Sequence, residues 1–269
     1  MAAVLSRISP APAVSIRRAS RLVARHMMIY RKTWPEFIAG FFEPLCYLLL
    51  VGIGLGPIIG QIAGPGGGEV SYISFAAPAM LAASAMNGAI YDSTFSVLFQ
   101  LLRYGKVFVA VQATPLTSSD IVLGQIIWAQ LRAVIYSTAF FAIMLAIGTV
   151  HSVWAVLVLP AASLAAFAFG AIGLASAAYM RSWQDLEFVT IGMLASYLFS
   201  ATFFPLSVYP HPVQVLVQLT PLYHASDLLR GLTLGVVTPG LLIDALYLAT
   251  VAGAAFVIAT RRVPRLLAP

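Results

Sequence analysis

Six long apolar stretches run through this 269-residue chain, and they constrain its fold more than any other feature. A transmembrane helix needs about 20 mostly apolar residues, because each residue advances about 1.5 Å across about 30 Å of hydrocarbon. Hydrophobic residues make up 61% of the chain and charged residues 9%, against roughly 45–50% and 25% in soluble domains. We therefore predict an all-α integral membrane protein with six transmembrane helices, at residues 37–59, 72–99, 121–147, 154–179, 188–205 and 236–259.

The basic residues are distributed unequally between the two sides that these spans would separate. We assign 14 of the 15 Lys and Arg residues to the side that holds both termini, and Arg230 to the other side. The 14 are Arg7, Arg17, Arg18, Arg21, Arg25, Arg31 and Lys32 before the first span, Arg103, Lys106 and Arg132 between the second and third, Arg181 between the fourth and fifth, and Arg261, Arg262 and Arg265 after the sixth. Since basic loops stay in the cytoplasm, both termini are predicted to be cytoplasmic.

Two parts of the chain follow from this division: residues 1–35, a cytoplasmic tail with an amphipathic interfacial helix, and residues 36–269, the six-span domain. At 100° per residue, Ile16, Val23 and Met27 share one helical face, with arginines opposite. Such a helix is expected to lie on the membrane surface; the alternative is a basic tail that only sets orientation. The net charge of +6 is therefore attributed to membrane lipids as partners, with no nucleic acid.

The gaps and small residues between the spans carry further predictions. Residues 60–71 contain GPGGG and predict a short flexible turn. Small residues recur along the fourth span at Ala166, Gly170, Gly173 and Ala177, which favours close helix packing. Residues 206–235 are rich in proline and have apolar stretches too short to cross, so we expect a re-entrant external segment before the last span.

Residues that could carry chemistry are few. No GxxxxGK[ST] phosphate-binding loop occurs, so the chain is predicted not to be an enzyme that hydrolyses ATP. His224, Asp227 and Arg230 follow at i, i+3 and i+6, which indicates either a polar helix face or an external acid/base cluster. Glu43 and Asp92 lie deep in predicted spans, where acids can relay protons, but no buried basic partner is evident for them.

Five stretches, in order, resemble the type-2 ABC (ABC-2) exporter permeases, especially their nodulation-factor, NodJ-like branch. They are FFEPLCYLLLVGIGLG (41–56), YISFAAPAMLAASAMNGAIYDSTF (72–95), ATPLTSSDIVLGQIIWAQLRA (113–133), FFPLSVYP (203–210) and PLYHASDLLRGLTLG (221–235). The resemblance implies the six-span permease half of an exporter in the bacterial inner membrane. It implies a dimer, as homodimer or heterodimer, beside two separate cytoplasmic ABC ATPase subunits. ATP and Mg would be bound by those subunits, with no cofactor or metal in this chain.

The resemblance also implies roles for particular positions. The cytoplasmic connection would dock the ATPase, through Arg103, Tyr104, Lys106, Phe108, Thr114, Pro115 and Asp120. For an exporter permease we expect a path between two protomers, lined by Phe41, Phe42, Glu43, Tyr47, Asn87, Asp92, Tyr197, Phe203 and Phe204, because aromatic rings can pack against both sugars and lipid tails. The resemblance places His224, Asp227 and Arg230 in the external segment. The chain departs from the family where Ala79 replaces a usual glycine and Asp92 a common glutamate.

Three functions are thus under comparison. The leading one is a permease that exports an amphipathic or lipid-linked substrate with ATP hydrolysed by its partner. The second is an ion-coupled secondary transporter that uses Glu43 and Asp92, and the third an integral-membrane enzyme that uses His224 and Asp227. Lipid-linked saccharides, glycolipids and amphipathic drugs all remain open as substrates.

Overall fold

The computed structural model describes residues 16–30, 42, 45–103 and 118–266. Within these ranges every regular element is a helix apart from one short hairpin, as expected of the all-α class. In chain order the elements are α1 (Ile16–Tyr30), η1 (Leu50–Leu55), α3 (Gly56–Ile59), β1 (Gln61–Ala63), β2 (Glu69–Ser71), α4 (Tyr72–Arg103), α6 (Ser118–Ile147), η2 (Val153–Leu157), α7 (Val158–Ala177), α8 (Gln184–Phe199), η3 (Leu206–Val208), α9 (His211–Gln218), α10 (Pro221–Leu234) and α11 (Gly240–Leu266).

Four helices in the described ranges are long and apolar enough to cross a membrane. They are Tyr72–Phe95 in α4, Leu123–Ile147 in α6, Val153–Ala177 through η2 and α7, and Gly240–Arg262 in α11. These coincide with the second, third, fourth and sixth predicted spans. In the first predicted span the structure contains the shorter apolar helix Leu45–Ile59, and in the fifth it contains α8, which has 16 residues. The layout of six spans therefore stays a prediction.

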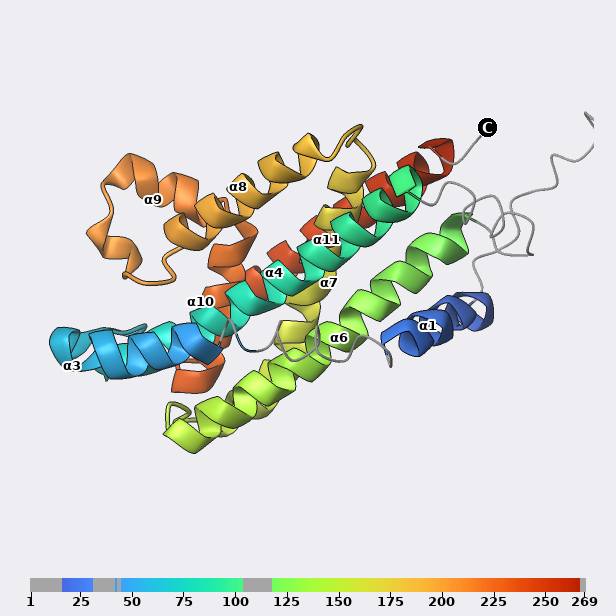
Figure 1. The fold of residues 1–269 in the computed structure, drawn as a ribbon. Coiled ribbons are helices and arrows are strands. Elements are labelled where there is room, and N and C mark those ends of the chain that lie inside the picture. Colours follow the sequence, from blue (N-terminus) through green and yellow to red (C-terminus); the bar gives the residue numbers. More distant parts are fainter. Residues whose placement is uncertain (1–15, 31–41, 43–44, 104–117, 267–269) are drawn as a thin grey trace, which may run out of the picture.

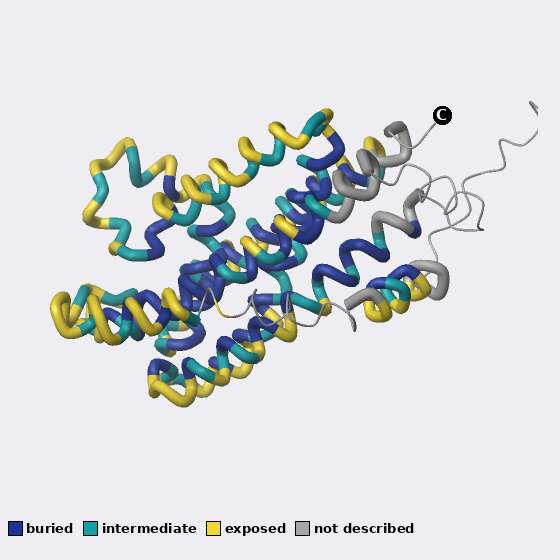
Figure 2. Tube along the Cα trace, viewed as in Figure 1, coloured by how far each residue is buried: buried dark blue, intermediate teal, exposed yellow. Residues whose placement is uncertain are grey.

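Helix α4 lies at the centre of the bundle, with α6, α7 and α10 packed around it (Figure 1). The described part of α4 is mostly dark blue in Figure 2, since residues such as Ala76, Leu81 and Met86 are almost fully buried. A Cβ added to Gly173 of α7 would stand 3.0 Å from both the Cα and the carbonyl oxygen of Ile90. The backbones of α4 and α7 therefore approach closely, which confirms the predicted packing role of the small residues.

The two ends of the bundle differ. Figure 1 places α1 and the C-terminal end of α11 at one end, and α3 and α9 at the opposite end. Residues 60–71, predicted as a flexible turn, form the antiparallel hairpin of β1 and β2, with Ile62 opposite Val70. Gly66 and Gly67 have φ values of +88° and +83° in its turn, a conformation that other residues rarely adopt. The glycines thus specify a hairpin turn between paired strands.

The segment before α11 folds into η3, α9 and α10 and is not a solvated loop. Helix α10 has 14 residues, which is roughly 21 Å and too short to cross the bilayer. The side chain of Thr220 caps its start by accepting from the Tyr223 N–H, and Gly235 ends it in the left-handed conformation. Because α10 packs against α4, α7 and α11, the segment reaches into the interior of the bundle.

The helix predicted near the N-terminus is present as α1, and it packs against α6. Leu22 and His26 are buried there, and the His26 ring stacks on Trp128 of α6 at 5.5 Å between ring centres. Burial and the charge of Arg25 lower the pKa of His26 from 6.5 to about 4. Met27, on the predicted apolar face, is 49% exposed. The location of α1 at the membrane surface stays a prediction.

Candidate functional site

Much of the predicted ATPase-docking connection lies outside the described residues, as do two positions of the predicted path. The residues concerned are Tyr104, Lys106, Phe108, Thr114 and Pro115 in the connection, and Phe41 and Glu43 in the path. Arg103 is the last residue of α4, and Asp120 lies in the first turn of α6, where it is buried. The docking assignment therefore stays a prediction.

Three aromatic residues predicted for the path lie together. Tyr47, on the apolar helix Leu45–Ile59, has its ring centre 6.4 Å from that of Tyr197 on α8. Tyr197 in turn meets the ring of Phe203 edge to face at 5.1 Å. Phe42 and Phe204 are 60% and 50% exposed. Residues about 150 positions apart in the sequence thus form one aromatic surface.

Asp92 of α4 has a buried basic partner on α6, contrary to the sequence-based expectation. The Nη1 of Arg132 on α6 donates to Oδ1 of Asp92 at 2.5 Å, and its Nε donates to the Tyr136 hydroxyl at 3.2 Å. Arg132 was counted with the cytoplasmic connection although it lies inside the predicted span 121–147. That assignment is wrong, because the residue also lies within the span Leu123–Ile147 of the structure. The side chains of Asp92 and Arg132 are 8% and 13% exposed. The pair therefore ties α4 to α6 at membrane depth.

Arg230 and His224, two of the three residues of the predicted external face, contact different partners. Arg230 is buried, and it donates to the carbonyl oxygens of Phe75 at 3.1 Å and Ala201 at 3.0 Å. Its guanidinium also lies 3.7 Å from the centre of the Phe75 ring. Arg230 thus connects α10 to α4 and to the turn after α8, and its role in the fold is to satisfy backbone carbonyls.

His224 pairs with an acid on α11, and not with Asp227 of its own helix. Its Nδ1 is 2.7 Å from Oδ1 of Asp244, and its Nε2 is 2.8 Å from the carbonyl oxygen of Gln218. The imidazole also stacks on Tyr247 at 3.9 Å. Burial, with the nearby charge of Asp244, raises the pKa of Asp227. These contacts hold α10 against α11, and they leave the acid/base hypothesis without a His224–Asp227 pair.

Asn87 is exposed, five residues before Asp92 on α4. Arg132 and Asp244 were the important residues that the sequence reasoning missed. A signal for Arg132 existed, since an ionisable residue within an apolar span usually pairs with an opposite charge. Among the described residues, no three His, Cys, Asp or Glu side chains come together as a group that could hold a metal ion.

Comparison with known proteins matches residues 18–234 to the family described as ABC-2 type transporter. The chain is 30% identical to Nodulation protein J of Rhizobium meliloti (strain 1021) over 213 residues, which are 78% of this chain and 79% of that protein. It is 31% identical to Nodulation protein J of Rhizobium leguminosarum bv. trifolii over 72% of each chain. It is 30% identical to that of Neorhizobium galegae over 78% of this chain and 79% of that protein. The resemblance inferred from the five motifs is confirmed.

Proposed function

Because the chain belongs to the ABC-2 type transporter family, we propose that it is the permease subunit of an ABC exporter in the bacterial inner membrane. It moves an amphipathic or lipid-linked substrate outward, and a separate cytoplasmic subunit binds ATP and Mg²⁺ and hydrolyses the nucleotide. Two permease copies form the working unit, as a homodimer or with a related chain. The family match over most of the chain supports this proposal.

The observation that carries the substrate class is the aromatic contact of Tyr47, Tyr197 and Phe203. Aromatic faces pack against both sugar rings and apolar chains, and the tyrosine hydroxyls add hydrogen-bonding groups. This aromatic surface, with the exposed Phe42 and Phe204 beside it in sequence, would therefore contact both parts of an amphipathic substrate as it passes.

The Asp92–Arg132 pair supports a mechanical role in the proposed cycle. Helix α4 ends before residues 104–117 and α6 begins after them, so both helices meet the connection proposed to dock the ATPase. A buried ion pair between the two helices would make them move together when the ATPase closes. It also occupies the Asp92 carboxylate, which the ion-coupled alternative requires as a relay.

The proposal is tested by reconstituting the chain in vesicles together with an ABC ATPase subunit that co-purifies with it. Export that needs ATP and is blocked by vanadate is expected. Transport by the isolated chain that follows a proton gradient would instead establish the ion-coupled alternative.

The path is tested by Tyr197→Ala, with Phe188→Ala as its control. Phe188 is 74% exposed on the same helix, so its loss should leave export unchanged. Tyr197→Ala removes the central ring of the cluster and its two ring contacts. Since each contact is worth ~0.5–1.5 kcal/mol beyond burial, the loss should lower export roughly 5- to 150-fold. Equal export by the two variants would refute the assignment of the aromatic cluster to the translocation path.

A further inference from the structure

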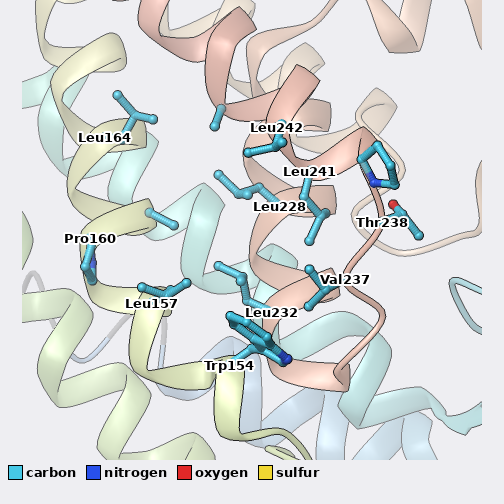
Figure 3. Close-up of a pocket in the computed structure, with 13 residues that line it drawn as sticks. Trp154, Leu157, Pro160, Leu164, Leu228, Leu232, Val237, Thr238, Leu241 and Leu242 are labelled. Atoms are coloured by element: carbon cyan, nitrogen blue, oxygen red, sulfur yellow. The ribbon is translucent and has the colours of Figure 1, made fainter.

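An apolar groove lies where α7, α10 and α11 meet, and it is lined by residues near the beginnings of α7 and α11 (Figure 3). Its volume is about 640 Å³, which is in the range of ~300–1,000 Å³ typical of small-molecule sites. It is lined by Trp154, Leu157, Pro160, Ala161, Leu164, Leu228, Leu232, Val237, Thr238, Pro239, Leu241, Leu242 and Ala245.

The groove has a buried floor and an exposed rim. Leu228 and Leu232 of α10, which form its floor, are 6% and 5% exposed. At the rim, Trp154 is 53% and Leu242 75% exposed. Thr238 carries the only side-chain hydroxyl of the lining, and Trp154 the only side-chain N–H. The groove is therefore open along one side and apolar along its length, with its polar groups on the rim residues Trp154 and Thr238.

The rim is continuous with the surface that α7 and α11 present to the membrane. Both walls belong to spans long enough to cross the bilayer. Next to the lining residues, Val156, Ile243 and Leu246 are 73%, 65% and 66% exposed, as expected of side chains that contact lipid. The groove thus opens sideways into hydrocarbon, where water has no hydrogen-bonding partners to hold it.

A groove that opens into the bilayer is expected to be occupied by lipid chains. If the groove were empty, the side chains that line it would lose dispersion contacts on that side. Inside a membrane there is also no hydrophobic force that would close the groove. A lipid chain restores those contacts without desolvating any charge, since the lining contains none. Trp154 is half exposed at the rim, and an indole at that place can donate its N–H to the ester region of a lipid.

We propose that this groove binds one acyl chain of a phospholipid from the leaflet at the α3 and α9 end, with Trp154 beside the headgroup region. The site lies on α7, α10 and α11 and does not include the aromatic cluster of Tyr47, Tyr197 and Phe203. It therefore goes beyond the proposed export path and does not depend on it. The bound chain packs against α10, the same helix that Arg230 and His224 hold to the rest of the bundle.

The test uses the full-length chain in phosphatidylethanolamine and phosphatidylglycerol vesicles that contain a phosphatidylethanolamine with a diazirine on its acyl chain. After illumination, mass spectrometry of the digested protein should find label on residues 154–164 and 228–245. Ala245→Phe puts a ring into the groove and should abolish that label. Ala254→Phe is the control, because Ala254 is exposed on the same helix and outside the groove.

Two outcomes would overturn the proposal. One is equal labelling of these peptides in wild type, Ala245→Phe and Ala254→Phe. That result would mean that the label comes from lipid on the outer surface of the helices and not from a chain bound in the groove. The other is an efficient disulfide between two copies that carry Thr238→Cys, because it would identify a second copy as the occupant. Should Ala245→Phe fail to give a monodisperse protein, Leu157→Trp fills the groove from its partly exposed wall and takes its place.

Discussion

Removing either member of the Asp92–Arg132 pair should destabilise the protein far more than replacing both. The two side chains are 8% and 13% exposed, so solvent screens their attraction little and the figures for surface ion pairs do not apply. Breaking a buried pair by removing one partner costs about 3–5 kcal/mol, because it leaves a charge without compensation. We expect Asp92→Leu and Arg132→Met each to have an effect of this size.

The double variant distinguishes two possible causes of instability. It loses the attraction between the two groups, as the single variants do, but it leaves no unpaired charge buried. Replacing a buried pair with apolar residues of similar volume is often neutral, or stabilising by about 1–4 kcal/mol. The Asp92→Leu/Arg132→Met protein should therefore be more stable than either single variant. A shift of 1 kcal/mol moves the melting temperature by ~2–4 °C in a protein of this size, so each single variant should melt about 6–20 °C lower.

The measurement is thermal unfolding of the purified chain in detergent, followed by fluorescence-detected size exclusion. All four proteins of the cycle are compared at one pH and one detergent concentration. Additive effects in the cycle would mean that the two groups do not interact. Asp92→Leu with wild-type stability and no transport would also refute the reasoning, because Asp92 would then act as a relay and not as a tie.

Two further variants test the packing of the bundle. Gly173→Ala forces a Cβ to 2.1 Å from Ser93 Oγ and 3.0 Å from the Ile90 backbone, so overpacking should cost about 1–3 kcal/mol, whereas Gly253→Ala meets nothing within 4 Å and should not lower the melting temperature. His26 has a folded-state pKa of about 4, below its usual 6.5, so its burial contributes stability that is complete above pH 6.5 and is lost as pH falls toward 4. His26→Phe keeps a ring against Trp128 and should remove that part of the pH dependence, as measured by melting temperature from pH 7 to 4. The same pH slope in wild type and His26→Phe would contradict the assignment.

The positions of four spans were predictable from the sequence, because the length and hydropathy of a single segment determine whether it can cross a bilayer. Crossing hydrocarbon requires a minimum length of apolar helix, so α4, α6, α7 and α11 could be located from hydropathy alone. The small residues of α7 also predicted a close helix contact, since they recur at the spacing of one helix face. The hairpin was missed because its two strands have only three residues each, too few for a periodic pattern.

The candidate site was predictable only in part. Tyr47, Tyr197 and Phe203 were selected as aromatic side chains of the first and fifth predicted spans, and the structure brings them together. Arg132 was assigned by counting charges along the chain, and such a count cannot tell a residue in a loop from one paired inside a span. For Arg230 the sequence showed a basic residue in an external segment, but not that it binds two backbone carbonyls.

The sequence by itself determined that this chain lies in a membrane and belongs to the ABC-2 transporters, because apolar length and ordered motifs are properties of the linear chain. Tertiary structure alone decided which polar groups meet. Asp92 finds Arg132 across 40 positions, and His224 finds Asp244 across 20. In a medium without water, buried charges need partners, and only the packing of the helices determines which partner is within reach.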